Sequence, residues 1–160
     1  MEKQILSILE RDARTTPDKI AVMIGKPEDE VRDAIADMEK RGVIRHYKAV
    51  IDWDKAGKES VFAFIDVRVT PSRGVGYDEI AGRIYKYPEV HSVYLVSGEY
   101  DLRVVVEGKT MQEVAFFVAE RLAPLDGVLS TRTNFLLKKY KSDGDIFEDT
   151  SDDFRLAVAP

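Results

Sequence analysis

Residues 16–42 read TPDKIAVMIGKPEDEVRDAIADMEKRG, and this stretch decides the fold of the N-terminal part of the chain. Thr16 followed by Pro17 is typical of a helix start, because threonine caps free backbone amides and proline suits the first helical position. Gly25 predicts the end of that helix and a tight turn. Another helix is predicted after the turn, because an apolar stripe at helical spacing is formed there by Val31, Ile35 and Met38. Two helices joined by a glycine turn predict a helix-turn-helix unit.

A further helix precedes this pair and an extended segment follows it. The preceding helix is indicated by the apolar residues Ile5, Leu6, Ile8 and Leu9, which recur at helical spacing among charged neighbours. Gly42, followed by Val43 and Ile44, is typical of a helix end. The run 43–51 is rich in β-branched residues, so we expect it to form a strand or wing that leads out of the unit.

From Val61 the apolar period changes from 3.6 residues to 2, which indicates a β-strand over 61–69. The next elements, in order, are a helix carrying Ile80, Ala81 and Ile84 and broken at Pro88, strands over 90–96 and 102–107, a helix opened by the capping box Thr110-Met111-Gln112-Glu113, and a long strand over 128–140. The order βαββαβ predicts a ferredoxin-like α+β domain with both helices on one face of an antiparallel sheet. The other face needs cover, and a second copy would supply it.

Composition and charge narrow the class of protein. The 160 residues are 44% hydrophobic and 33% charged, which is typical of a soluble globular protein. The chain has no cysteine and two histidines, so we expect no metal, no cofactor and no catalytic site. Its apolar runs are shorter than the roughly 18 residues that a membrane span needs, and we expect a cytoplasmic protein. The net charge of -5 resides in the tail, because residues 1–50 hold equal numbers of acidic and basic residues.

Short motifs in both halves carry a family resemblance. They are ILSILERDAR at 5–14, EKRGVI at 39–44, YKAVI at 47–51, GEYD at 98–101, GV at 127–128 and TRT at 131–133. In this order and spacing, over roughly residues 2–141, the chain resembles the Lrp/AsnC or feast/famine family of transcriptional regulators. The resemblance implies a winged helix-turn-helix domain over 1–50, a linker over 51–60, a ferredoxin-like effector-binding and oligomerisation domain over 61–141, and an acidic tail over 142–160.

The resemblance also implies an amino-acid-like effector bound between subunits of a dimer or octamer, near the turn between the second and third strands. The residues that match this site are Gly98, Tyr100, Asp101, Thr131 and Thr133. A glycine lets an α-carboxylate approach backbone amides, a carboxylate suits an α-ammonium, and hydroxyl groups can orient the ligand. Without the resemblance, Gly-Glu-Tyr-Asp between two strands is more often a plain hairpin turn than a ligand site.

Double-stranded DNA is the other expected partner, although the predicted recognition helix is acidic. The candidate DNA contacts are the basic residues around and within it: Arg14, Lys19, Lys26, Arg32, Lys40, Arg41, Arg45 and Lys48. Apart from Arg32, these residues can position phosphates without reading sequence, and they are equally typical of a solvated surface that carries both signs of charge. Glu28, Asp29 and Glu30 suit the positive end of the helix dipole but would repel a phosphate there. Arg32 is left as the one base-reading candidate in the middle of the helix.

Two other functions fit parts of the pattern. An oligomeric amino-acid sensor that does not bind DNA directly would explain the acidic helix. A siroheme decarboxylase has a similar domain arrangement, but such an enzyme needs histidine and arginine residues around a large tetrapyrrole pocket, and this chain has only two histidines. We therefore predict a sequence-specific DNA-binding regulator rather than an enzyme.

Overall fold

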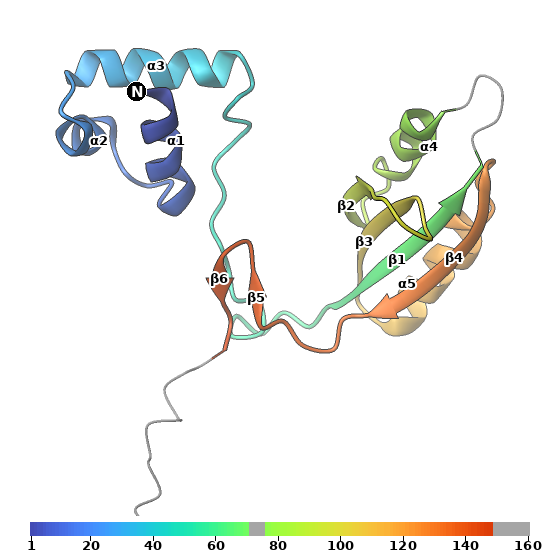
Figure 1. Ribbon diagram of the computed structural model, residues 1–160. Helices are drawn as coiled ribbons and strands as arrows, with labels where there is room; N and C mark the ends of the chain where they lie inside the picture. The colour runs from blue at the N-terminus through green and yellow to red at the C-terminus, as the bar shows by residue number, and fades with distance from the viewer. Residues whose placement is uncertain (71–75, 149–160) are drawn as a thin grey trace, which may run out of the picture. The chain divides into compact units, whose positions relative to one another are not determined.

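The computed structural model describes residues 1–70 and 76–148 (Figure 1). The chain divides into two compact units, Met1–Ile51 and a second unit from Asp52 onward. Each unit has its own apolar core.

The N-terminal unit is a bundle of three helices, α1 (Glu2–Arg11), α2 (Pro17–Ile24) and α3 (Glu28–Lys40). As predicted, Thr16 is the N-cap of α2 and Pro17 is its first residue. Gly25 ends α2 in the left-handed conformation (φ 65°), which glycine adopts without steric cost. Four fully buried side chains close the core: Ile5, Ile20, Val31 and Met38. Burial of each of these side chains stabilises the folded state by roughly 1.5–3 kcal/mol. The arrangement of α2, the Gly25 turn and α3 confirms the helix-turn-helix prediction.

Residues 43–51 do not form the predicted strand or wing. The amides of Val43 and Ile44 both donate to the Met38 carbonyl oxygen and thereby complete the end of α3. Val50 beyond them is 62% exposed. A strand needs a neighbouring backbone to pair with, and the regular elements described in this unit are all helices. The β-branched composition of the segment was therefore overridden by its surroundings.

The second unit is built on a four-stranded antiparallel sheet. Its strands are β1 (Val61–Val69), β2 (Val90–Leu95), β3 (Leu102–Gly108) and β4 (Val128–Phe135). They are arranged in the order β2-β3-β1-β4, so β1 lies between β3 and β4. This is the predicted ferredoxin-like arrangement.

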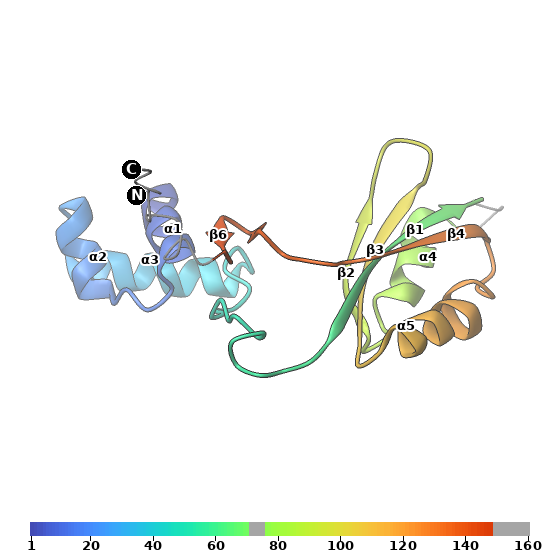
Figure 2. The same cartoon turned by 90° about the horizontal axis from the view of Figure 1, so that it is seen from below.

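Both helices of this unit lie on the same face of the sheet (Figure 2). They are α4 (Tyr77–Ile84) and α5 (Met111–Phe117), the latter continued by the π-helical turn η1 (Val118–Leu122). The core lies between these helices and alternate residues of the strands. It includes Ile65, Val67 and Val104 from the strands, Ile80 from α4 and Leu122 from η1. Thr110 caps α5 as predicted, because its Oγ1 accepts from the Glu113 amide at 3.1 Å. The Glu113 carboxylate accepts from the Lys109 amide at 2.7 Å, one residue before the N-cap amide that a capping box would use.

The last strand is shorter than predicted and ends at Phe135 rather than near residue 140. The Leu136 amide still donates to the Phe62 carbonyl, but β1 begins at Val61, so the residues after Leu136 extend beyond the end of β1 and cannot pair with it. The first part of the predicted acidic tail belongs to a small hairpin of β5 (Lys141–Ser142) and β6 (Asp145–Ile146). The sequence FRLAV at 154–158 predicts a segment that adds a strand to a partner or covers a sheet edge, and it lies outside the described residues.

Candidate functional site

The surface expected to meet DNA comprises α3, the turn before it and the segment after it (Figure 1). All eight predicted DNA contacts are exposed: Arg14, Lys19, Lys26, Arg32, Lys40, Arg41, Arg45 and Lys48. Lys19 lies on α2, Lys26 in the turn, and Arg32 and Lys40 on α3. This spread suits contacts to several phosphates along a duplex.

Two of these eight cations are held by carboxylates of their own unit. Arg32 pairs with Glu28 one helical turn earlier. Arg41 binds Glu2 at 2.7 Å and Asp37 at 2.6 Å, and these bonds raise the pKa of its guanidinium, Glu2 having the larger effect. A phosphate or base must therefore replace a carboxylate before either arginine can contact DNA.

The exposed surface of α3 is predominantly negative. Its exposed acids are Glu28, Asp29, Glu30, Asp33, Asp37 and Glu39, and its exposed bases are Arg32 and Lys40. Carboxylates repel phosphates, but in the major groove they can accept hydrogen bonds from the amino group of cytosine. The chemistry of α3 therefore suits base edges, while affinity for the backbone has to come from the basic residues around it.

Tyr47 is a residue of this unit that the sequence analysis did not assign. Its hydroxyl donates to Glu39 Oε1 at 2.8 Å and ties the segment after α3 back to the helix. Burial of the ring, followed by the bond to Glu39, raises the pKa of Tyr47 to about 12. The hydroxyl is therefore a permanent donor at neutral pH.

The turn between β2 and β3 carries three of the five predicted effector residues. Gly98 adopts φ 139°, which L side chains rarely adopt. The ring of Tyr100 lies beneath two guanidinium groups, those of Arg132 at 4.8 Å and Arg68 at 5.4 Å. Asp101 Oδ2 accepts from the Val69 amide at 2.8 Å. The Asp101 carboxylate thus already has one structural role, joining the turn to the end of β1.

The other two predicted effector residues lie on a different face of the sheet. Thr131 and Thr133 are opposite Val67 and Ile65 in β1, and they share the helix-covered face with them. The intervening Arg132 is the residue whose guanidinium contacts Tyr100. The structure therefore brings Gly98, Tyr100 and Asp101 together but does not place the threonine hydroxyls with Tyr100 within one subunit.

The sheet face opposite the helices contains an ionic cluster that sequence reasoning missed. Asp66 in β1 is 1% exposed and accepts from Arg103 in β3 at 2.8 Å and from Arg132 in β4 at 3.1 Å. Asn134 adds a longer contact at 3.4 Å. The bond from Arg103 is the main cause that holds the pKa of Asp66 below its ordinary value, although burial opposes it. The only sequence signal was a single acid at an outward position of an apolar strand.

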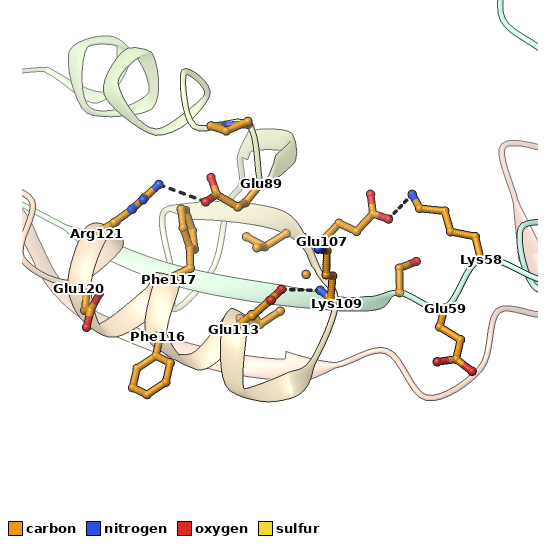
Figure 3. Close-up of a pocket in the computed structure, with 15 residues that line it drawn as sticks. Lys58, Glu59, Glu89, Glu107, Lys109, Glu113, Phe116, Phe117, Glu120 and Arg121 are labelled. Atoms are coloured by element: carbon orange, nitrogen blue, oxygen red, sulfur yellow. Dashed lines mark hydrogen bonds and ion pairs between the residues drawn. The ribbon is translucent and has the colours of Figure 1, made fainter.

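A cavity of about 640 Å³ lies beside α5, and its lining is drawn in Figure 3. Glu89 and Arg121 form an ion pair at 3.1 Å in its wall. A second pair, Lys58 and Glu107 at 2.6 Å, lies in another part of the lining. Burial raises the pKa of Glu107, but bonds from Lys58, His91 and Ser60 outweigh that effect and lower it overall. No motif in the sequence predicted this cavity.

Two family models match the chain in the order in which its units occur. The Lrp/AsnC ligand binding domain matches residues 62–146, which is more than half of the chain. The chain belongs to the Lrp/AsnC family. A winged helix-turn-helix DNA-binding model matches residues 1–45, which cover the three-helix unit.

Relatives over nearly the whole chain are named as regulators. The chain is 53% identical over 160 residues to the uncharacterized HTH-type transcriptional regulator YugG of Bacillus subtilis, covering 99% of this chain and 96% of that protein. It is 35% identical to the uncharacterized HTH-type transcriptional regulator PH0140 of Pyrococcus horikoshii, covering 85% of this chain and 84% of the relative. The protein is thus a DNA-binding helix-turn-helix transcriptional regulator with an Lrp/AsnC ligand-binding domain, as the sequence predicted.

Solved structures share its fold. The leucine response regulatory protein LrpA of Mycobacterium tuberculosis superposes with a TM-score of 0.75 at 24% identity, covering 90% of this chain and 95% of that one. The regulator NMB0573 of Neisseria meningitidis, crystallised as a complex with L-Met, gives 0.72 at 23% identity, covering 88% and 90%. Among the described residues, no helix is both long and apolar enough to cross a membrane.

Proposed function

We propose that the protein is an oligomeric regulator that binds its operator through α3 and the surrounding cations and responds to an amino acid bound at the turn between β2 and β3. The observation that carries this proposal is the cluster of Gly98, Tyr100 and Asp101 on the ligand-binding domain of a DNA-binding chain. The occurrence of L-Met in the complex of NMB0573 supports an amino acid as the class of effector.

The groups at this turn complement the two charged ends of an amino acid. Asp101 uses Oδ2 to bind the Val69 amide, and its other oxygen is available to an α-ammonium. Arg68, beside Tyr100, holds Glu99 by a contact of 3.4 Å, which an α-carboxylate can replace. We propose that Thr131 and Thr133 reach the same effector only from another subunit, because their own strand turns them to the opposite face.

A second copy of the chain would cover the face of the sheet that α4 and α5 leave uncovered. This face carries Tyr94, which is 55% exposed, the half-buried Phe64 and Val105, and the Asp66 cluster between them. An exposed aromatic and apolar patch is typical of a subunit interface, and the charge of Asp66 within it is already paired with Arg103 and Arg132. A second copy related by twofold symmetry would present the same surface to this patch.

Calorimetric titration of the full chain with each of the twenty amino acids tests the effector site. Asp101→Asn is the informative variant, because an amide oxygen can still accept from Val69 while the negative charge is removed. We expect this variant to lose at least about tenfold in affinity for the amino acid that binds, as charge-assisted bonds contribute about 1.5–3 kcal/mol. Asp145→Asn in the separate β5–β6 hairpin is the matched control, because it removes the same charge outside the turn, and it should leave the affinity unchanged. Unchanged affinity in Asp101→Asn would contradict the assigned site.

A further inference from the structure

The cavity beside α5 is a second place in this domain where a small molecule can bind. Its lining comes from the end of the linker, the start of β2, the end of β3, and the α5–η1 helix. The turn residues Gly98, Tyr100 and Asp101 do not contribute to it. Figure 3 shows the side chains of Glu89 and Arg121 facing one another, with the ring of Phe117 beside them.

Glu89 has an incomplete set of hydrogen bonds. Its Oε1 accepts from Arg121 at 3.1 Å. In the part of the chain that the structure describes, its Oε2 is buried and receives no hydrogen bond. A carboxylate oxygen out of contact with water and without a donor is costly, so this atom favours any N–H that reaches it. Glu89 also lines the cavity, so a ligand bound there lies next to this carboxylate.

The rest of the lining is apolar near Glu89 and negative at its margin. Val106, Val114 and Phe117 are buried core residues that also line the cavity. Two cations of the lining, Arg121 and Lys58, are bound to glutamates. The carboxylates of Glu59 and Glu120, which also line the cavity, have no ion pair with another described residue. The lining as a whole holds five glutamates (Glu59, Glu89, Glu107, Glu113 and Glu120) and three cations (Lys58, Lys109 and Arg121). Its excess charge is therefore negative, and a ligand should bring a positive charge and an apolar body.

We propose that this cavity binds a small apolar amine, whose ammonium donates to Glu89 and whose hydrocarbon part packs on Phe117 and Val114. A divalent cation is a poorer fit, because it needs several oxygen ligands and the Glu89 carboxylate already binds Arg121. An amino acid is also a poorer fit, because its α-carboxylate would meet the excess of glutamates. The site is therefore separate in position and in ligand chemistry from the proposed effector site on the turn.

Ligand-observed and protein-observed NMR of the full chain with 2-phenylethylamine tests the proposal, with 2-phenylethanol and 3-phenylpropionate as neutral and anionic matches. We expect the amine to bind, to shift the resonances of Phe117 and Val114, and to bind at least about tenfold more tightly than the alcohol. Glu89→Gln should remove that tenfold preference. The substitution Glu89→Gln keeps the shape of the side chain, and circular dichroism checks that the variant protein folds.

Glu79→Gln is the matched control, because Glu79 pairs with Arg83 in a comparable ion pair on α4 but does not line the cavity. It should leave amine binding unchanged. Asp101→Asn should likewise leave it unchanged, which separates this proposal from that of the effector site. Equal binding of amine and alcohol, no binding, or an amine preference that persists in Glu89→Gln would overturn the proposal.

Discussion

Replacement of Asp66 by Asn tests the ionic centre of the uncovered sheet face. The side chain of Asp66 is 2% exposed, while those of Arg103 and Arg132 are 49% and 53% exposed. Hydrogen bonds to charged groups contribute about 1.5–3 kcal/mol each, and solvent around the half-exposed guanidinium groups favours the lower end. Loss of the charge should therefore cost the second unit about 2–3 kcal/mol, or a fall in Tm of about 10 °C for a unit of this size.

The pH dependence of this loss separates the ionic role of Asp66 from a packing role. The pKa of Asp66 is lower in the folded state than its ordinary value, mainly because of Arg103. Its stabilisation is therefore complete above the unfolded-state pKa of about 3.9 and disappears as the pH falls through the folded-state value. Urea unfolding at pH 7 and pH 3, at one protein concentration, should show a larger difference between wild type and Asp66→Asn at pH 7 than at pH 3. An equal difference at both values would refute the reasoning.

Four further substitutions test other parts of the structure. Glu28→Gln releases Arg32 and removes a carboxylate from α3, so fluorescence anisotropy should show tighter DNA binding, whereas Arg32→Ala should weaken it. Phe64→Glu places a charge in the proposed subunit interface and should shift the sedimentation of the protein to a smaller species while its circular dichroism is kept. Gly127→Ala should lower the free energy of unfolding by about 1–3 kcal/mol, because φ is 90° there and a Cβ would lie 2.9 Å from Ile80 Cδ1; a stable variant in urea unfolding would disprove this.

The elements with strong local signals could be predicted from the sequence. Thr16 with Pro17 and the αL glycine Gly25 specify the start and end of α2 within a few residues. The period of 2 over 61–69 specifies β1, and Thr110 as the N-cap specifies the start of α5. Each of these signals acts over a few residues and needs no knowledge of the rest of the fold.

The features that depend on strand register could not be predicted. Asp66 meets Arg103 and Arg132 from 37 and 66 residues away, and those pairs follow only from the alignment of three strands. The same register places Thr133 on the face of the sheet opposite to Tyr100, although the family resemblance implies that both residues bind the effector. The segment 43–51 shows the reverse case, in which a strong local preference for a strand found no partner.

The central claim, that this Lrp/AsnC protein couples specific DNA binding to an amino acid, is tested most directly by a titration of a labelled duplex from its own upstream region. Binding should be followed by anisotropy at about 50 and 200 mM salt, with and without a pool of the twenty amino acids. The account predicts saturable binding that an unrelated duplex does not compete, that weakens with salt, and that an amino acid shifts. Binding that is equal for both duplexes or absent, and unaffected by amino acids, would contradict the claim.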